Sequence, residues 1–186
     1  MIKILDVAER LVQTRGFNRF SYADIAREVG VTKPALHYHF PSKTDLGVAI
    51  IGRYHERFTS ALAGLEGAGI GPLEALARYI GLYRDVLRRD RLCLCGMLAA
   101  ESETLPEAMR SAIVRFFDDN VAWLTNTLLA GKQARVLRFY APAAQEAATL
   151  LSSLEGAMLI ARLRHDPDSF DATSERLVAT LTTRPR

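Results

Sequence analysis

The feature that most constrains the fold is the helical spacing of apolar residues, which recurs along nearly the whole chain. Ile4, Leu5, Ala8, Leu11 and Val12 set the pattern in the first segment, because apolar residues three and four apart share one face of an α-helix. No stretch of useful length alternates apolar and polar residues as a β-strand does. The spacing therefore predicts an all-α fold of amphipathic helices joined by short loops.

Glycine and proline residues divide this pattern into separate helices. Gly16 is expected to end the first helix, and Ser21 and Ser42 are expected to cap the second and fourth, the fourth running from Lys43 to about Leu65. The glycine-rich run 64–72 predicts a loop and a domain boundary. It separates an N-terminal domain, residues 1–57, from a helical C-terminal domain, residues 58–186. The later helices are expected near 73–89, 93–103, 106–130, 142–164 and 169–183, with Gly131 ending the longest.

Composition excludes several classes of protein. The 186 residues are 49% hydrophobic, which is enough for a sizeable core. No apolar run approaches the roughly 20 residues that a membrane helix needs, so no membrane partner is expected. The start of the sequence, residues 1–4, is not typical of a signal peptide. The two cysteines exclude a disulfide framework. A cytoplasmic location fits these features.

The net charge of +3 is unevenly placed. Residues 1–57 contain nine Lys and Arg and six Asp and Glu, which gives +3, whereas residues 58–186 contain fifteen of each. A basic end on a neutral body is typical of a protein that binds nucleic acid. The excess is small, so chance placement is an alternative.

Residues 21–40 carry the clearest functional pattern. Two helices of about eight residues are joined by the tight turn Gly30-Val31-Thr32, which is the layout of a helix-turn-helix. Pro34 fits the first turn of the second of these helices. Leu36 and Phe40 would face the interior, and the outward face would carry Thr32, Lys33, Ala35, His37, Tyr38 and His39. Such a set suits phosphates and base edges in a DNA groove. A three-helix subdomain with an ordinary polar face is the alternative.

The segment from Ser21 to Lys43, SYADIAREVGVTKPALHYHFPSK, strongly resembles the signature of the TetR family of bacterial repressors. The flanking Leu11, Gly16-Phe17 and Asp45-Leu46 also resemble that family, and the specific match covers about residues 2–57. The resemblance implies a nine-helix, Ω-shaped homodimer with two recognition helices in successive major grooves of a palindromic operator. It also implies a repressor that a small molecule releases from DNA through a pocket in the C-terminal domain.

Carried over position by position, the resemblance places nine residues at the DNA, and His37 is a tenth candidate. Ser21, Tyr22 and Lys43 would meet phosphates, and the recognition helix would present Thr32, Lys33, Pro34, Ala35, Tyr38 and His39. Position 37 departs from the pattern, because the family usually has Tyr there and this chain has His37 followed by Tyr38. Either ring could therefore meet the backbone phosphate.

Candidate ligand-binding residues are the aromatic, sulfur-containing and acidic residues of the middle of the chain. The alternative is that these side chains are ordinary core residues and that the acidic one, Glu101, is an ordinary solvated charge. They are Tyr83, Cys93, Met97, Glu101, Phe116, Phe117, Trp123 and Met158.

The stretch 93–101, CLCGMLAAE, resembles a helix of a TetR branch that includes electrophile- and oxidant-sensing repressors. Arg88, Arg89 and Arg91 could favour a thiolate if they approach Cys93 or Cys95. The alternative, a structural role for these small side chains, is the favoured one.

The last two helices supply a candidate dimer interface, because each has an apolar face that one protomer need not cover. The alternative is packing within one chain. The expected interface residues are Leu150, Leu154, Ala157, Met158, Ala161, Leu177 and Leu181.

Other functions find little support in the sequence. It has no glycine-rich phosphate loop, no Gly-x-Ser-x-Gly, no His-Glu-x-x-His and no cysteine pair with zinc spacing, so no enzyme, cofactor or metal is expected. His37 and His39 point about 200° apart on a helix and cannot share a metal unaided. A helical adaptor protein that keeps the fold without the DNA contacts is the remaining rival.

Overall fold

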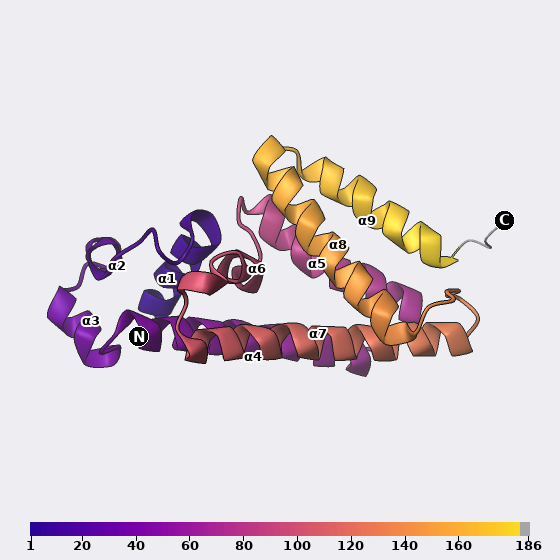
Figure 1. Ribbon diagram of the computed structural model, residues 1–186, viewed down its shortest axis with the longest axis horizontal. Coiled ribbons are helices and arrows are strands. Elements are labelled where there is room, and N and C mark those ends of the chain that lie inside the picture. Colours follow the sequence, from indigo (N-terminus) through magenta and orange to yellow (C-terminus); the bar gives the residue numbers. More distant parts are fainter. Residues whose placement is uncertain (183–186) are drawn as a thin grey trace. The chain divides into compact units, whose positions relative to one another are not determined.

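The computed structural model describes residues 1–182, and every regular element in that range is a helix, as the apolar spacing predicts (Figure 1). No helix in this range is both long and apolar enough to cross a bilayer. The helices are α1 (Ile2–Arg15), α2 (Tyr22–Val29), α3 (Lys33–His39), α4 (Lys43–Gly67), α5 (Pro72–Arg88), α6 (Leu94–Ala99), the 3₁₀ turn η1 (Ser102–Thr104), α7 (Glu107–Gln133), α8 (Ala143–Arg164) and α9 (Pro167–Thr182).

The chain packs into two compact units. Unit 1 consists of Met1–Phe58 and Arg91–Phe116, and unit 2 consists of Thr59–Asp90 and the chain from Phe117 onward. The divisions fall inside α4 and α7, so each of these helices contributes residues to both units. The segment 91–116 therefore packs with the N-terminal helices. A functional boundary between residues 57 and 58 stays a prediction.

Local sequence explains the helix ends in unit 1. The backbone N–H of Ser21 donates to the carboxylate of Asp24 at 2.9 Å, which caps α2. Gly30 ends α2 in the left-handed conformation, with φ 78°, and its N–H donates to the Ala26 carbonyl at 2.9 Å. Thr32 then caps α3 through its side-chain oxygen. These ends confirm the expected helix-turn-helix geometry.

Two expected helix ends in the middle of the chain are wrong. The helix expected at 93–103 stops at Ala99, because the Glu101 N–H bonds to the Leu98 carbonyl at 3.0 Å and tightens the chain into η1. Gly131 does not end α7, which continues to Gln133. An ideal Cβ at Gly131 would lie 2.4 Å from a Leu137 methyl carbon, so glycine is needed there for close packing by the following loop.

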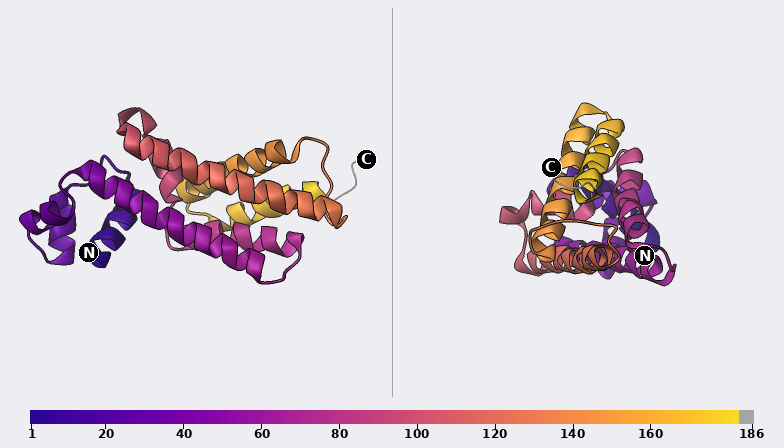
Figure 2. Two further views of the ribbon diagram at one scale, coloured as in Figure 1. Left: turned by 90° about the horizontal axis from the view of Figure 1, so that it is seen from below. Right: turned by 90° about the vertical axis from the view of Figure 1, so that its right-hand side faces the viewer.

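Unit 2 is organised around the antiparallel pair α8 and α9, which lie side by side in Figures 1 and 2. α9 begins at Pro167 and not at 169, because proline is tolerated in a first helical turn. Its expected end at residue 183 lies outside the described residues. α5 packs against both α8 and α9, and Arg84 of α5 forms an ion pair with Asp171 of α9.

Candidate functional site

Helix α3 presents almost its whole length to solvent. Leu36 is 1% exposed and packs the inner face of α3 against the rest of unit 1, whereas Tyr38 is 84% exposed. The remaining outward residues expected at DNA are exposed as well, and they are Thr32, Lys33, Pro34, Ala35 and His39. An exposed tyrosine on a short helix held by one buried leucine is unlike ordinary core packing. The face therefore has the shape and chemistry of a recognition surface.

The structure distinguishes the two rings left open at the departure from the family pattern. The His37 ring lies 4.6 Å from the Tyr22 ring, centroid to centroid, and its Nδ1 is 3.2 Å from the Pro41 carbonyl oxygen. His37 thus bonds to the turn after α3. Tyr38 contacts the His39 ring edge-on at 5.3 Å and leaves its hydroxyl in solvent. His37 is exposed as well, but its contacts with Tyr22 and Pro41 favour Tyr38 as the ring that would meet a phosphate.

Tyr22 has an internal role that the sequence did not suggest. Its side chain is buried, and its hydroxyl lies 2.8 Å from the Phe40 carbonyl oxygen and 2.7 Å from that of Ser42. Burial, and next the negative charge of Asp45, raise the pKa of the Tyr22 hydroxyl. The hydroxyl proton is shared by the two carbonyls of the α3–α4 turn, which corrects the expectation that it meets a phosphate. Ser21 remains exposed beside it.

The ammonium of Lys43 also bonds within the protein. It donates to the carbonyl oxygens of Phe17 and Phe20, both at 2.6 Å, and lies 4.6 and 4.5 Å from the centres of the same two rings. Burial lowers the pKa of this ammonium, against the opposing charges of Glu101 and Asp24. Two of its three donors are used by the α1–α2 loop, so the geometry favours a structural role over the expected phosphate contact.

The candidate ligand-binding residues divide between the two units: Cys93, Met97, Glu101 and Phe116 belong to unit 1, and Tyr83, Phe117, Trp123 and Met158 belong to unit 2. Glu101 is in unit 1, where its carboxylate accepts from the backbone of Phe17 and Asn18 and faces the α1–α2 loop. That position corrects its assignment as a ligand anchor. Phe116 is fully buried in unit 1, with its ring 5.5 Å from that of Tyr54. The half-buried Met97 also belongs to unit 1.

Unit 2 contains a buried polar cluster between α5 and α7. Tyr79 stacks on Trp123 at 5.3 Å, and its hydroxyl donates to the Asn120 side-chain oxygen at 3.0 Å and lies 3.2 Å from the Tyr83 hydroxyl. Of these four, the sequence singled out Tyr83 and Trp123. Asn120 was missed, although its place four residues after Phe116 puts it on the inner face of α7. Of the other candidates, Met158 is buried in unit 2 and Phe117 is half-buried.

The indole nitrogen of Trp123 has no hydrogen-bond partner among the described residues. The side chain is 8% exposed, so its N–H is largely shielded from water. An unsatisfied buried donor costs about 1–3 kcal/mol. A molecule carrying a hydrogen-bond acceptor would remove that cost, which makes the cluster a candidate ligand site.

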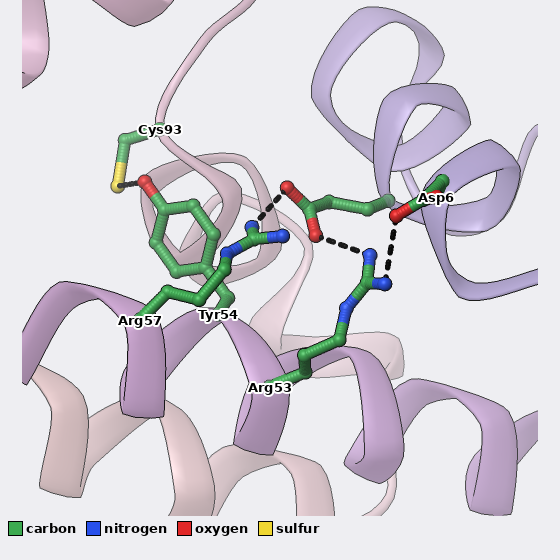
Figure 3. A network of polar contacts seen from close by, with 6 residues as sticks. Asp6, Arg53, Tyr54, Arg57 and Cys93 are labelled. Atoms are coloured by element: carbon green, nitrogen blue, oxygen red, sulfur yellow. Dashed lines mark hydrogen bonds and ion pairs between the residues drawn. The ribbon is translucent and has the colours of Figure 1, made fainter. Parts of the chain in front are cut away.

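The two cysteines are buried, at 2% and 0% exposure for Cys93 and Cys95. The Cys93 sulfur lies 3.8 Å from the hydroxyl of Tyr54, which donates to it (Figure 3). Two of the three arginines expected to favour a thiolate are engaged elsewhere, because Arg88 pairs with Asp171 and Arg89 donates to the Asp85 carbonyl. Burial next to a phenol favours the structural role of Cys93.

An ion-pair network beside these residues joins α1 to α4. Glu9 is 6% exposed, and its two carboxylate oxygens accept from Arg53 at 2.9 Å and from Arg57 at 2.6 Å. Arg53 also donates to Asp6 at 2.7 Å (Figure 3). Because a carboxylate is rarely buried unless it is paired, this network fixes α1 against α4 within unit 1.

The outward face of α8 differs from the expected dimer face. Of the expected interface residues only Ala157 and Leu177 are partly exposed, and the others form the core of unit 2, which corrects their assignment to a partner. The core residues are Leu150, Leu154, Met158, Ala161 and Leu181. The exposed apolar residues of α8 are instead Leu159, Ile160 and Leu163, at 47%, 53% and 81%.

Family comparisons agree with these arrangements. Residues 4–50 match the model of bacterial regulatory proteins of the tetR family. Residues 72–177, more than half of the chain, match the model of a tetracyclin repressor-like C-terminal domain. The first range contains the whole helix-turn-helix, and the second contains the buried polar cluster of unit 2.

Individual relatives cover most of the chain. The transcriptional repressor NemR of Escherichia coli is 30% identical over 86% of this chain and 82% of its own length. A transcriptional regulator of the TetR family from Agrobacterium tumefaciens has a crystal structure that superposes with a TM-score of 0.94 at 33% identity, covering 98% of this chain and 97% of that one. The crystal structure of reduced E. coli NemR superposes with a TM-score of 0.83 at 25% identity, covering 99% and 97%. The chain therefore belongs to the TetR family of bacterial regulatory proteins.

Proposed function

We propose that this regulator is a cytoplasmic repressor that reads a duplex DNA operator with the outward face of α3. The observation that carries the proposal is the exposure of Tyr38, at 84%, opposite a Leu36 that is 1% exposed. Lys33 supplies a cation, His39 a ring that can bond to a base edge, and Ala35 a small side chain that allows close approach. Similarity to named repressors supports repression as the mode of regulation.

A dimer would give the operator its symmetry. We assign the partner surface to the outward face of α8, where Leu159, Ile160 and Leu163 are exposed on one protomer. A Cβ at Gly156, three residues before Leu159, would meet nothing within 4 Å, and small residues allow helices to approach closely. Two copies would place their recognition helices in successive major grooves, about 34–36 Å apart.

The effector would bind in unit 2 beside Trp123. Its unpaired indole N–H favours a ligand with a hydrogen-bond acceptor, and the stacked Tyr79 and Trp123 rings favour an otherwise apolar body. Ligand binding would lower operator affinity by favouring a conformation that no longer fits the two grooves. The coupling is reciprocal, so operator DNA must weaken ligand binding by the same factor.

Operator binding is tested by footprinting the purified protein on the DNA upstream of its own gene, followed by affinity measurements on the protected duplex. Tyr38→Ala should weaken operator binding by about tenfold or more, since a base or phosphate contact is worth about 1–3 kcal/mol. Tyr140→Ala is the matched control, because Tyr140 is 87% exposed but lies in unit 2. Equal affinities for the two variants and wild type would refute the assignment. Absence of wild-type binding to any duplex would favour the adaptor alternative.

Effector binding has an internal probe, because Trp123 is the only tryptophan in the chain. Apolar compounds with and without a carbonyl group are titrated while the indole fluorescence and the operator affinity are recorded. A carbonyl compound that binds should shift the fluorescence and release DNA, and its isostere without the carbonyl should bind more weakly. Binding that leaves operator affinity unchanged would refute the coupling.

A further inference from the structure

The carboxylate of Glu101 holds the loop that precedes the helix-turn-helix. One oxygen, Oε2, accepts from the backbone N–H of Phe17 at 3.0 Å, and from the backbone N–H and the side-chain amide of Asn18, both at 3.1 Å. The Asn18 amide also donates to the Thr104 hydroxyl at 2.8 Å. The turn between α6 and α7 is therefore bonded to residues more than 80 positions earlier in the chain, all within unit 1.

The same loop is held on its carbonyl side by Lys43. The peptide groups at Phe17 thus have their N–H bonded to an anion and their C=O bonded to a cation. Charge-assisted hydrogen bonds are roughly twice as strong as neutral ones. The loop is consequently fixed from two elements, the α6–α7 turn and the first residue of α4, and both attachments are polar and directional.

The backbone at Gly16 is shaped to admit the Glu101 carboxylate. An ideal Cβ at Gly16 would lie 2.1 Å from Glu101 Oε1, and Gly16 has φ +88°, which other residues rarely adopt. A second attachment lies nearby, where the Leu92 N–H donates to the Gln13 carbonyl at 3.2 Å. The close fit at Gly16 and the bonds at Phe17 and Asn18 are independent observations of one seated side chain.

The position of this loop in space influences the position of the first turn of α2. Asn18 is three residues before Ser21, the N-cap of α2, and α2 in turn packs against α3. A shift of the loop therefore moves the start of α2 and, through it, the recognition helix. We infer that Glu101 is a positioning residue for operator binding, which it favours by holding the α1–α2 loop, and this inference rests on the proposed function of α3.

Positioning and simple charge have opposite expected effects on DNA binding. Glu101 carries a negative charge in the DNA-binding unit, so its removal should slightly strengthen binding to any duplex, because DNA attracts positive charge. Loss of positioning should instead weaken binding to the operator, which demands one orientation of α3. The ratio of operator affinity to non-specific affinity therefore separates the two effects.

The test compares Glu101→Ala with Glu103→Ala as a matched control. Glu103 is exposed two residues away and loses the same charge, but its side chain makes no bond to the loop. Each protein is titrated with its footprinted operator and with a scrambled duplex of equal length, after urea unfolding has shown that it is folded. Glu101→Ala should lower the affinity ratio about tenfold, comparable to one net hydrogen bond. Glu103→Ala should leave the ratio unchanged.

Two further variants keep the test decisive if Glu101→Ala folds poorly. Glu101→Gln retains an oxygen that can accept the same bonds and should restore most of the ratio. Asn18→Ala removes an exposed side chain from the loop and should lower the ratio with little loss of stability. An unchanged ratio in Glu101→Ala or Asn18→Ala, or an equal fall in Glu103→Ala, would overturn the inference. Absence of operator preference in the wild-type protein would instead overturn the proposed function.

Discussion

Replacing Lys43 with methionine separates a structural lysine from a DNA-contacting one. Methionine keeps an apolar stem against Phe17 and Phe20 and removes the ammonium, which donates to both of their carbonyl oxygens at 2.6 Å. A hydrogen bond to a charged group contributes about 1.5–3 kcal/mol, and a cation–π contact at a partly exposed site about 0.5–1 kcal/mol.

These contributions do not simply add for Lys43, because the side chain is half-exposed and water can reach the two carbonyls after the substitution. We therefore expect a net loss of about 2 kcal/mol in the free energy of unfolding. For a chain of this size that corresponds to a fall of about 4–8 °C in Tm. Protein concentration must be held constant, because dimerisation contributes to apparent stability.

The assay combines urea unfolding with the salt dependence of operator binding. Lys33→Met is the matched control, since Lys33 is exposed on α3. It should leave unfolding unchanged and reduce the magnitude of the slope of log affinity against log salt by about 0.9 for each protomer, or about 1.8 for the proposed dimer. Lys43→Met should show the reverse pattern. Unchanged unfolding together with a slope reduced in magnitude by about 1.8 in Lys43→Met would refute the structural role.

Three shorter predictions concern the dimer face, the α2 cap and the buried cluster. Leu163→Arg should yield a folded monomer in sizing chromatography, since the side chain is 81% exposed in one protomer; an unchanged dimer would exclude this face. The Ser21 backbone N–H, and next its hydroxyl, hold the pKa of Asp24 below its usual value. The stability that Asp24 provides is therefore present above its unfolded pKa and is lost as pH falls through the lower folded pKa. The difference in unfolding free energy between wild type and Asp24→Ala should accordingly disappear on acidification. Tyr79→Phe removes the 3.0 Å bond to Asn120 and should cost about 1–3 kcal/mol in urea unfolding without changing effector-free operator affinity.

The sequence predicted the helices well because their ends depend on local chemistry. Gly30, Thr32 and Ser42 act within one turn of their own position, through a left-handed backbone or a side chain that bonds three residues away. The errors at α6 and α7 have a different origin. The tight turn at Glu101 is stabilised by bonds to residues 17 and 18, which no local window contains.

The candidate DNA-binding face could likewise be predicted only where it depends on helical periodicity. The helical spacing around Leu36 identifies Tyr38 as outward. It cannot show that Tyr22 and Lys43 bond to carbonyls of other segments. The same limit explains the dimer face. Apolar residues surround α8 on more than one side, so spacing alone does not reveal that Leu154 is in the core and Leu163 is exposed.

Only some of the nine lysine and arginine residues in the N-terminal segment, residues 1–57, are free to meet DNA. Four arginines of this segment form ion pairs within the chain, since Arg10 pairs with Glu28, Arg27 with Asp24, Arg53 with Asp6 and Glu9, and Arg57 with Glu9. The Lys43 ammonium donates to the carbonyl oxygens of Phe17 and Phe20. Within residues 1–182, exposed cations without an ion pair in the N-terminal segment include Lys3, Arg19 and Lys33. Counterions are released when a cation neutralises a phosphate, and a cation that already pairs with a carboxylate must first give up that partner, so we expect the unpaired, exposed cations to dominate the attraction of this segment for DNA.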